Sequence, residues 1–299
     1  MFSRIRRAAD QTGAIFRKVQ ELQSSLRSAR EALGRIELRQ LAQSASTELA
    51  SHEFQVYSQW GEDGIIQRLL RDVPVKRQLF VEFGVQDYTE SNTRFLLVNN
   101  NWAGLVIDAS AADIGFIKRD PIYWRHNLKA VEAFITRENI NDLLRTNGVT
   151  GDIGLLSVDI DGIDYWVWEA IDCVSPALVI AEYNSRFGPE RSVTVAYDAG
   201  FVREKAHSSS AYYGASLAAL VGLGRRKGYA FVGSNSAGSN AFFVRRDLLP
   251  SSIRELSVHE GYVGLQFREA RDAQGKFADL SPEDEAALVN ALPLVEVPL

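Results

Sequence analysis

Carboxylates gather at the ends of two apolar runs in this sequence. Asp159, Asp161 and Asp164 stand in Asp159-Ile-Asp-Gly-Ile-Asp164, and Glu182 and Asn184 end the next run. Such runs predict buried strands, and the carboxyl ends of neighbouring parallel strands meet at one rim of a sheet. Hard oxygen donors suit a divalent ion, so we predict that Asp159, Asp161, Glu182 and Asn184 bind Mg²⁺ or Mn²⁺. Such an ion lowers the pKa of a bound hydroxyl and orients it for reaction.

Other roles stay open for these residues. Asp159 or Asp161 could act as a general base without a metal, and we expect Asp164 to cap the following helix in any case. Asp159-Ile-Asp-Gly162 also resembles the nucleophile motif of haloacid-dehalogenase phosphatases, although Ile163 replaces the usual Thr or Val. His207 is a further candidate base because the pKa of imidazole lies near neutrality, but an ordinary loop histidine is the commoner case.

A second pattern concerns nucleotide binding. Phe80-Val-Glu-Phe-Gly84 predicts a strand and a tight turn, and Trp102-Ala-Gly-Leu-Val-Ile-Asp108 predicts a second strand that ends in a carboxylate. Gly84 lets the backbone approach a ligand closely, and Asp108 is placed to accept hydrogen bonds from a ribose diol. Residues 86–88 are Gln-Asp-Tyr, without further glycines. A phosphate-free adenosine ligand such as S-adenosylmethionine (SAM) therefore fits better than NAD.

Residues around these two strands complete the predicted cofactor site. Glu82 is costly to bury in a strand unless a ligand amine or a nearby Arg satisfies it. Ser58 and Gln59 could bind the methionine carboxylate or amine of SAM, or Ser58 could simply cap a helix. The residues predicted to bind the cofactor are Ser58, Gln59, Glu82, Gly84, Asp87, Asn92, Thr93, Asp108, Ala109 and Ser110.

The elements that position these residues alternate along the chain. Strands are predicted at 79–84, 103–108, 128–134, 153–159, 177–183, 228–233 and 240–245. Helices are predicted at 61–71, 90–98, 110–118, 137–146, 164–172 and 214–227. This order predicts an α/β fold with a mostly parallel sheet, closed by a C-terminal antiparallel hairpin. Segments 84–93, 108–110, 159–164 and 182–188 should then converge on one site.

Three blocks resemble FkbM-type class I SAM-dependent methyltransferases, many of which are encoded among surface-polysaccharide assembly genes. The blocks are Tyr57-Ser-Gln-Trp-Gly-Glu-Asp-Gly-Ile-Ile66, the segment 81–93 and the segment 156–169, within a resemblance over 55–246. The resemblance implies a Rossmann-type SAM-binding fold and O-methylation of a sugar hydroxyl of a carbohydrate or glycoconjugate. Tyr88 stands where many members have Gly, and Asp108 where many have Glu. The alternative is a non-catalytic scaffold of this fold with a degenerate pocket at Tyr88, tethered to a polysaccharide-assembly complex.

The N-terminal segment carries a separate pattern. Apolar residues recur at alternating spacings of four and three, with only Thr12 breaking the series: Met1, Ile5, Ala8, Ile15, Val19, Leu22, Leu26, Ala29, Leu33 and Ile36. This period predicts a coiled coil and a homo-oligomer. The alternative is an amphipathic helix that packs on its own domain or lies on a membrane surface, helped by Arg4, Arg6 and Arg7. The predicted organisation is a helical arm at 1–42, a linker at 43–54 and the methyltransferase-like domain at 55–299.

Charge and composition exclude several classes. Residues 1–40 hold nine basic and four acidic side chains, a net charge of +5, so the chain total of −5 leaves −10 for residues 41–299. We therefore expect no nucleic-acid binding by the body. The single cysteine, Cys173, excludes an intramolecular disulfide. No apolar run approaches the length of a membrane span, so we expect a cytoplasmic protein whose basic arm could contact the inner membrane face.

Side chains beside the acidic cluster are also candidates. Arg186 and Tyr183 could contact a substrate phosphate or sugar ring. Trp166 and Trp168 stand two residues apart on one predicted helix and therefore point to different faces. We expect them to be packing residues.

Overall fold

The computed structural model describes residues 2–44, 46–267, 271, 276–277 and 280–299, with the backbone alone for residues 2–11 and 282. The chain divides into two compact units, Met1–Ser44 and Ala45–Leu299. Among the described residues, no helix is both long and apolar enough to cross a membrane.

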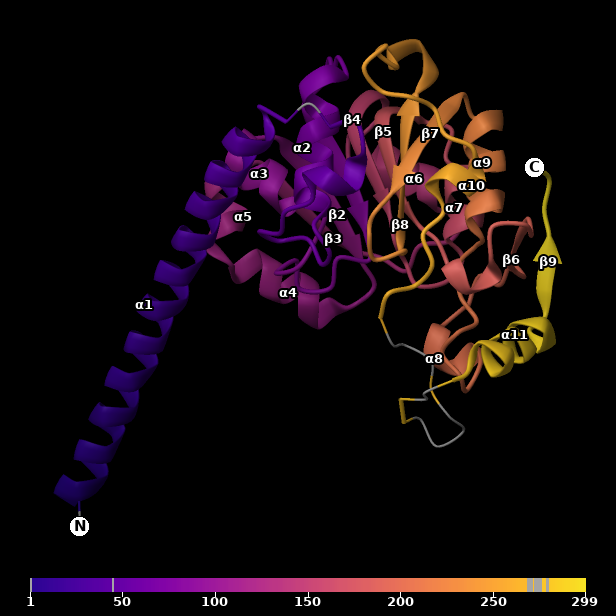
Figure 1. Ribbon diagram of the computed structural model, residues 1–299. Coiled ribbons are helices and arrows are strands. Elements are labelled where there is room, and N and C mark those ends of the chain that lie inside the picture. The colour runs from indigo at the N-terminus through magenta and orange to yellow at the C-terminus, as the bar shows by residue number, and fades with distance from the viewer. Residues whose placement is uncertain (1, 45, 268–270, 272–275, 278–279) are drawn as a thin grey trace. The chain divides into compact units, whose positions relative to one another are not determined.

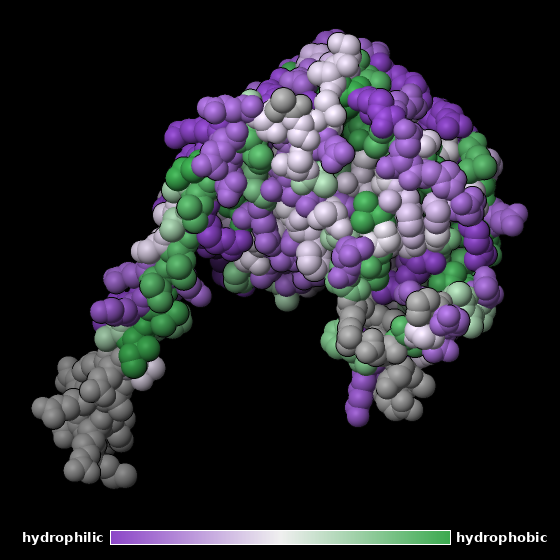
Figure 2. All heavy atoms as spheres, in the orientation of Figure 1, coloured by the Kyte–Doolittle hydropathy of each residue, from purple (hydrophilic) through white to green (hydrophobic). Residues whose placement is uncertain are grey.

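The first unit is one long helix, α1 (Phe2–Leu41) (Figure 1). The described apolar side chains of its heptad series are exposed, with 65% of Ile15, 61% of Leu22 and 57% of Leu26 open to solvent. Figure 2 shows these side chains as apolar surface along the helix. Met1 and the side chains of Ile5 and Ala8 lie outside the described residues. Association through this face stays a prediction.

The second unit is built on a seven-stranded sheet in the order β3-β2-β1-β4-β5-β8-β7. The strands are β1 (Leu79–Phe83), β2 (Ala103–Asp108), β3 (Leu128–Glu132), β4 (Gly151–Val158), β5 (Val174–Glu182), β7 (Tyr229–Ser234) and β8 (Asn240–Arg245). Strands β1 to β5 pair in parallel, and β8 is antiparallel to both β5 and β7. The predicted α/β fold, a mostly parallel sheet with a C-terminal hairpin, is confirmed.

Helices cover both faces of this sheet because alternate strand residues point to opposite sides. On one face, Val81, Leu156 and Val179 pack in a core with residues of three helices. These are α6 (Ile140–Thr146), α7 (Asp164–Ala170) and α9 (Leu217–Arg226). On the other face, Phe80 and Leu155 share a core with residues of four helices. These are α2 (Glu62–Asp72), α3 (Arg94–Asn100), α4 (Ala111–Arg119) and α5 (Pro121–Arg125).

The predicted helix at 90–98 begins later than expected, at Arg94. The Glu82 carboxylate accepts the backbone N–H groups of Asn92 and Thr93 at 2.8 and 3.1 Å, and this holds the preceding residues as a loop. The sequence did not predict α5 or the elements after residue 245. It also gave no helix or strand within 184–211, where the structure has short elements. The remaining elements are η1 (Leu49–His52), η2 (Ser185–Phe187), β6 (Val193–Val195), α8 (Arg203–Ala206), η3 (Arg246–Leu248), α10 (Val258–Gly261), α11 (Pro282–Ala291) and β9 (Leu294–Glu296).

Candidate functional site

The loops after β1 and β4 touch at Gly84. Its φ is +67°, and a Cβ there would lie 1.8 Å from the carbonyl oxygen of Asp159. A side chain at this position would clash with that oxygen, and the positive φ would add backbone strain. The glycine brings the two strand ends together, and two cavities lie beside this contact.

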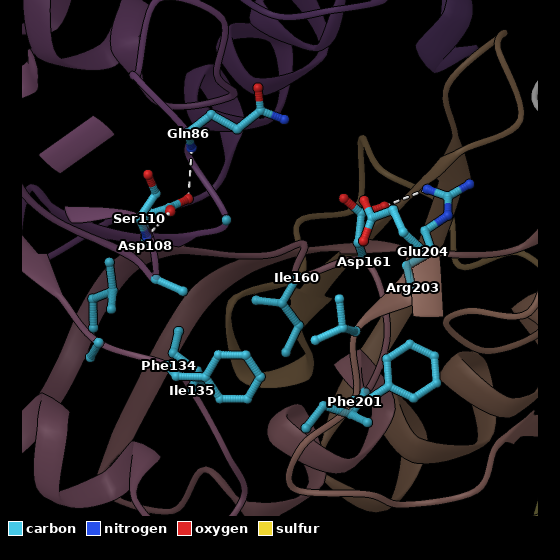
Figure 3. A pocket seen from close by; sticks show the side chains of 16 residues that line it. Gln86, Asp108, Ser110, Phe134, Ile135, Ile160, Asp161, Phe201, Arg203 and Glu204 are labelled. Atoms are coloured by element: carbon cyan, nitrogen blue, oxygen red, sulfur yellow. Dashed lines mark hydrogen bonds and ion pairs between the residues drawn. The ribbon is translucent and has the colours of Figure 1, made fainter. Parts of the chain in front are cut away.

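The first cavity has a volume of about 510 Å³ and lies at the ends of β1, β2, β3 and β4 (Figure 3). We call it the apolar cavity, because side chains such as Phe134, Ile135, Ile160 and Phe201 form much of its wall. Four residues of the predicted cofactor set line it: Gly84, Asp108, Ala109 and Ser110.

Asp108 is held in place at one side of this cavity. One carboxylate oxygen accepts the Gln86 N–H and the other accepts the Ser110 N–H, both at 2.8 Å. The Ser110 hydroxyl in turn caps α4 by accepting the Asp113 N–H. Because each carboxylate oxygen can accept a further bond, Asp108 remains able to bind hydroxyl groups in the cavity.

The second cavity has a volume of about 520 Å³ and shares Gly84, Gln86, Asp161 and Arg203 with the apolar cavity. The two cavities therefore adjoin. We call the second the acidic cavity, because its lining contains Arg203 and seven carboxylates: Glu82, Asp87, Glu90, Asp113, Asp159, Asp161 and Glu182. A lining of this charge favours a cationic ligand over an anionic one.

Three of these carboxylates form a cluster. Asp159, Asp161 and Glu182 each offer an oxygen, and these oxygens all lie within 4.8 Å of one another. Burial raises the pKa of Asp159 well above its usual value, and the neighbouring Asp161 carboxylate raises it further. Burial and the charge of Asp159 likewise raise the pKa of Glu182. Arg203, ion-paired with Asp161, offsets part of this negative charge.

This cluster fits a divalent cation by its donor set. Two oxygens bound to Mg²⁺ at about 2.1 Å are at most about 4.2 Å apart, so the cluster needs only a small contraction. Within the described residues, Oε2 of Glu182 is buried without a hydrogen-bond partner. A cation would satisfy this oxygen and relieve the repulsion among the carboxylates.

Asp164 does not cap the following helix, which corrects the prediction. It is the first residue of α7, and its carboxylate accepts the N–H groups of Ile160 at 2.7 Å and Gly162 at 2.9 Å. Burial raises its pKa to about 6. Asp164 thus fixes the loop that carries Asp159 and Asp161.

Glu82 lies in the acidic cavity, but the chain already satisfies it. Besides the two backbone N–H groups, it accepts the Thr93 hydroxyl at 2.5 Å. Burial raises its pKa to about 7, and these hydrogen bonds oppose that rise. The loop before α3 supplies these partners in place of an Arg, and contact of Glu82 with a ligand amine stays a prediction.

The other residues predicted to bind the cofactor lie in two environments. Gln59, Asp87 and Asn92 line the acidic cavity. Ser58 and Thr93 are fully buried and do not line either cavity. Ser58 exchanges hydrogen bonds with Asp63, and Thr93 bonds Glu82.

Tyr88 lies in the core and is absent from the lining of both cavities. Its ring is fully buried, its hydroxyl is 2.9 Å from that of Thr93, and its φ is +62°. The positive φ explains why glycine suits this position. The side chain that occupies it here leaves the acidic cavity open.

Asn184 and His207 form hydrogen bonds with residues that line neither cavity. The Asn184 amide donates to the carbonyl oxygens of Ala211 and Tyr213, and its oxygen accepts the Arg186 N–H at 3.2 Å. Neither Asn184 nor His207 is among the residues that line the cavities. Nδ1 of His207 lies 2.7 Å from the Ser209 hydroxyl. The structure therefore brings Asp159, Asp161 and Glu182 together without these two residues.

The remaining candidates have structural contacts. Arg186 pairs with Glu285 at 2.9 Å, and the Tyr183 hydroxyl donates to the Val263 carbonyl oxygen at 2.7 Å. Trp168 is buried in the core, and Trp166 packs against it and donates to the Val195 carbonyl oxygen. No residue of segment 183–188 lines either cavity, so only Glu182 of the predicted segment 182–188 belongs to the site.

Sequence reasoning missed Phe134, Ile135, Phe201, Arg203 and Asn240, which line the cavities. Phe134 and Ile135 follow β3, so the rule that ligands bind beyond the carboxyl ends of strands could have found them. Arg203 begins α8, and Asn240 begins an antiparallel strand, for which that rule gives no signal.

The chain matches no protein-family model and no curated protein. Solved structures with a similar fold include the N-terminal domain of EvdMO1 with SAH bound, which is 11% identical over 61% of this chain and 79% of that chain, with a TM-score of 0.40. The citrinin polyketide synthase CMeT domain is 10% identical over 62% of this chain and 51% of that one, with a TM-score of 0.41. An S-adenosylmethionine-dependent methyltransferase from Clostridium acetobutylicum ATCC 824 is 8% identical over 61% of this chain and 89% of that chain, with a TM-score of 0.39. At these values the likenesses assign neither a family nor an activity to the chain.

Proposed function

We propose that this protein is a SAM-dependent O-methyltransferase that acts on a sugar hydroxyl of a carbohydrate or glycoconjugate. The observation that carries the proposal is the pair of adjoining cavities around Gly84. One is apolar and has Asp108 at its side, while the other is lined by carboxylates. A ligand with an adenosine at one end and positive charge at the other matches this pair.

Each part of SAM has a matching environment. The adenine fits the apolar walls that include Phe134 and Ile135, and the ribose hydroxyls donate to Asp108. The sulfonium lies where the cavities adjoin, near Gly84. Gln59, Asp87 and Asn92 supply polar contacts for the methionine end, and negative surroundings favour its cationic groups.

The acceptor hydroxyl belongs in the acidic cavity, beside the carboxylate cluster. Its oxygen bonds to the methyl carbon as the carbon–sulfur bond breaks, and the bonding pair stays on sulfur. The hydroxyl proton passes to Asp159, whose raised pKa makes it a stronger base than an ordinary carboxylate. Most of the catalysis then comes from holding donor and acceptor in line.

The cluster also supports the metal-assisted form of this reaction. Asp159, Asp161 and Glu182 would hold Mg²⁺ or Mn²⁺. The bound ion supplies a lower pKa for the acceptor hydroxyl.

Binding and turnover test the proposal. We expect calorimetry to detect SAM and S-adenosylhomocysteine, and radiolabelled methyl transfer to appear with a member of a carbohydrate acceptor panel. Chelation should abolish transfer without releasing SAM, and Mg²⁺ or Mn²⁺ should restore it. Full activity in chelator, lost on Asp159→Asn, would assign Asp159 as a metal-free base. Absence of SAM binding would reject the proposal that this protein is a SAM-dependent methyltransferase.

The exposed apolar face of α1 favours a second candidate, a non-catalytic scaffold that self-associates through this helix. Strong self-association without SAM binding would support the scaffold. The enzyme itself is equally compatible with an oligomer, so SAM binding is the deciding measurement.

A further inference from the structure

Asn240 lies beside the carboxylate cluster on the far side of Glu182. It is the first residue of β8 and pairs directly with Glu182 across the antiparallel β5–β8 ladder. Side chains of such a pair project from the same face of a sheet, with Cβ atoms about 5 Å apart. Asn240 lines the acidic cavity and is only 7% exposed.

The orientation of its amide is fixed by Glu62. The Asn240 Nδ2 donates to Oε1 of Glu62 at 2.8 Å, and a carboxylate cannot donate in return. The nitrogen must therefore face Glu62, and Oδ1 must face the other way. Glu62 is itself held, because Oε1 also accepts Asn235 Nδ2 and Oε2 accepts the Trp60 N–H.

The outward oxygen has nothing to bind within the described chain. Oδ1 of Asn240 and Oε2 of the adjacent Glu182 are both buried, and neither has a hydrogen-bond partner. Leaving one buried acceptor unsatisfied costs about 1–3 kcal/mol. Two such acceptors on paired residues of one cavity indicate a ligand that supplies positive charge to both.

We propose that Asn240 is a fourth protein ligand of a divalent-cation site, together with Asp159, Asp161 and Glu182. The inference rests on the metal-assisted form of the proposed function. When all three carboxyl groups are ionised, they and Arg203 carry a net charge of −2, which a divalent ion would neutralise. The amide oxygen adds a hard donor without further charge.

Asn240 thus takes the part that the sequence suggested for Asn184, whose amide binds the 211–213 loop. A divalent ion held by these four protein oxygens would still have coordination positions for a ligand. Two neighbouring hydroxyls of a sugar can fill them, so the preferred acceptor is a vicinal diol. A sugar with a single free hydroxyl at this point should be a poorer substrate.

The test measures Mn²⁺ binding to the full-length protein by electron paramagnetic resonance, without SAM. We expect the wild type to bind and Asn240→Ala to bind at least tenfold more weakly. Gln67→Ala is the matched control, since Gln67 is equally buried at 7% exposure. Its amide forms a hydrogen bond with Asn100 and does not line the cavity. That variant should bind as the wild type does.

The outcomes separate the two proposals. Equal Mn²⁺ affinity of the wild type and Asn240→Ala would overturn the role of Asn240 and leave the carboxylate site standing. If the wild type fails to bind Mn²⁺, both the metal site and the role of Asn240 in it are rejected. The proposal that the protein is a SAM-dependent methyltransferase is then still tested by SAM calorimetry. If Asn240→Ala does not fold, an anomalous map of wild-type crystals with Mn²⁺ tests whether Asn240 coordinates the ion. Oδ1 in the coordination shell supports the inference, and an ion bound by carboxylates alone overturns it.

Discussion

Asp108 is the residue on which cofactor affinity should depend most. Charge-assisted hydrogen bonds from a ribose to a carboxylate contribute about 1.5–3 kcal/mol each, so Asp108→Ala should weaken SAM binding at least tenfold in calorimetry. Glu132→Ala is the matched control, because Glu132 occupies the paired position on β3 but lies outside both cavity linings. Wild-type affinity in Asp108→Ala would show that the ribose lies elsewhere or that SAM is not the ligand.

Gly84 should be the least replaceable glycine at the site. Gly84→Ala places a Cβ 1.8 Å from the Asp159 carbonyl oxygen, so the loops must separate. Gly148→Ala is the control, because Gly148 has a similar φ of +79° but nothing within 4 Å of an added Cβ. We expect a cost of about 1 kcal/mol for the control from backbone strain. Gly84→Ala should cost clearly more and abolish SAM binding. Equal costs in urea unfolding would refute the close contact as the reason for this glycine.

Sequence patterns identified some site residues and could not identify others. Asp108 ends the parallel strand β2 and the 159–161 pair follows the parallel strand β4, so their position was predictable from topology alone. Asn184 follows such a strand too, yet its amide bonds a loop that is near in space and 27 residues away in sequence. Asn240 reaches the cavity from an antiparallel strand, where the topological rule does not apply. Side-chain partners across long sequence separations were the missing information.

At the level of elements, the face of α1 makes a definite prediction about assembly. Leu22→Glu puts a charge into the proposed helix–helix seam, which should disfavour association. Ser24→Glu is the control, since Ser24 is also exposed but lies two positions off the heptad series. Light scattering should give the 33.3 kDa monomer for Leu22→Glu and a larger mass for Ser24→Glu and the wild type. A monomeric wild type would contradict the predicted coiled coil and favour a role for α1 as a membrane or partner surface.

Most elements of the sheet were predictable because buried strands appear as short apolar runs between turn residues. β2 has the predicted bounds. The start of α3 was not predictable, because it depends on the buried Glu82 capturing two backbone N–H groups. The β6–β9 pairing joins segments about a hundred residues apart, and β6 is only three residues long. A strand so short carries too little periodicity to be recognised.

For the whole molecule, buried carboxyl groups predict a stability that falls with rising pH. The pKa of Glu82 rises from its usual 4.5 to about 7, and that of Asp63 from 3.8 to about 6. A group with a raised folded pKa stabilises the fold below its unfolded pKa, and this stabilisation is lost as pH rises through the folded value. For Glu82 the loss corresponds to about 3 kcal/mol. Exposed Glu138 and Glu260, with pKa values lowered to about 2, stay charged throughout this range.

Urea unfolding at pH 5 and pH 8 measures this effect. We expect a lower free energy of unfolding at pH 8, and partial recovery there on adding Mg²⁺ or Mn²⁺, because a cation stabilises the charged forms of Asp159 and Glu182. Sodium at matched ionic strength should give no comparable recovery. A free energy that stays level between pH 5 and pH 8 would contradict the burial of these carboxyl groups.

The pairing of Glu62 with Asn240 joins residues 178 positions apart, and the Glu53–Ser236 contact joins residues 183 apart. Contacts of such sequence separation form late, because the entropy of closing the loop is lost before they stabilise the fold. During synthesis, β5 stays an unprotected sheet edge until β8 has left the ribosome, and unpaired strand edges promote aggregation. We therefore expect the ligand cavity to be among the last parts of a nascent chain to form. Incomplete chains that end between β5 and β8 should depend on chaperones and have no capacity to bind the ligand.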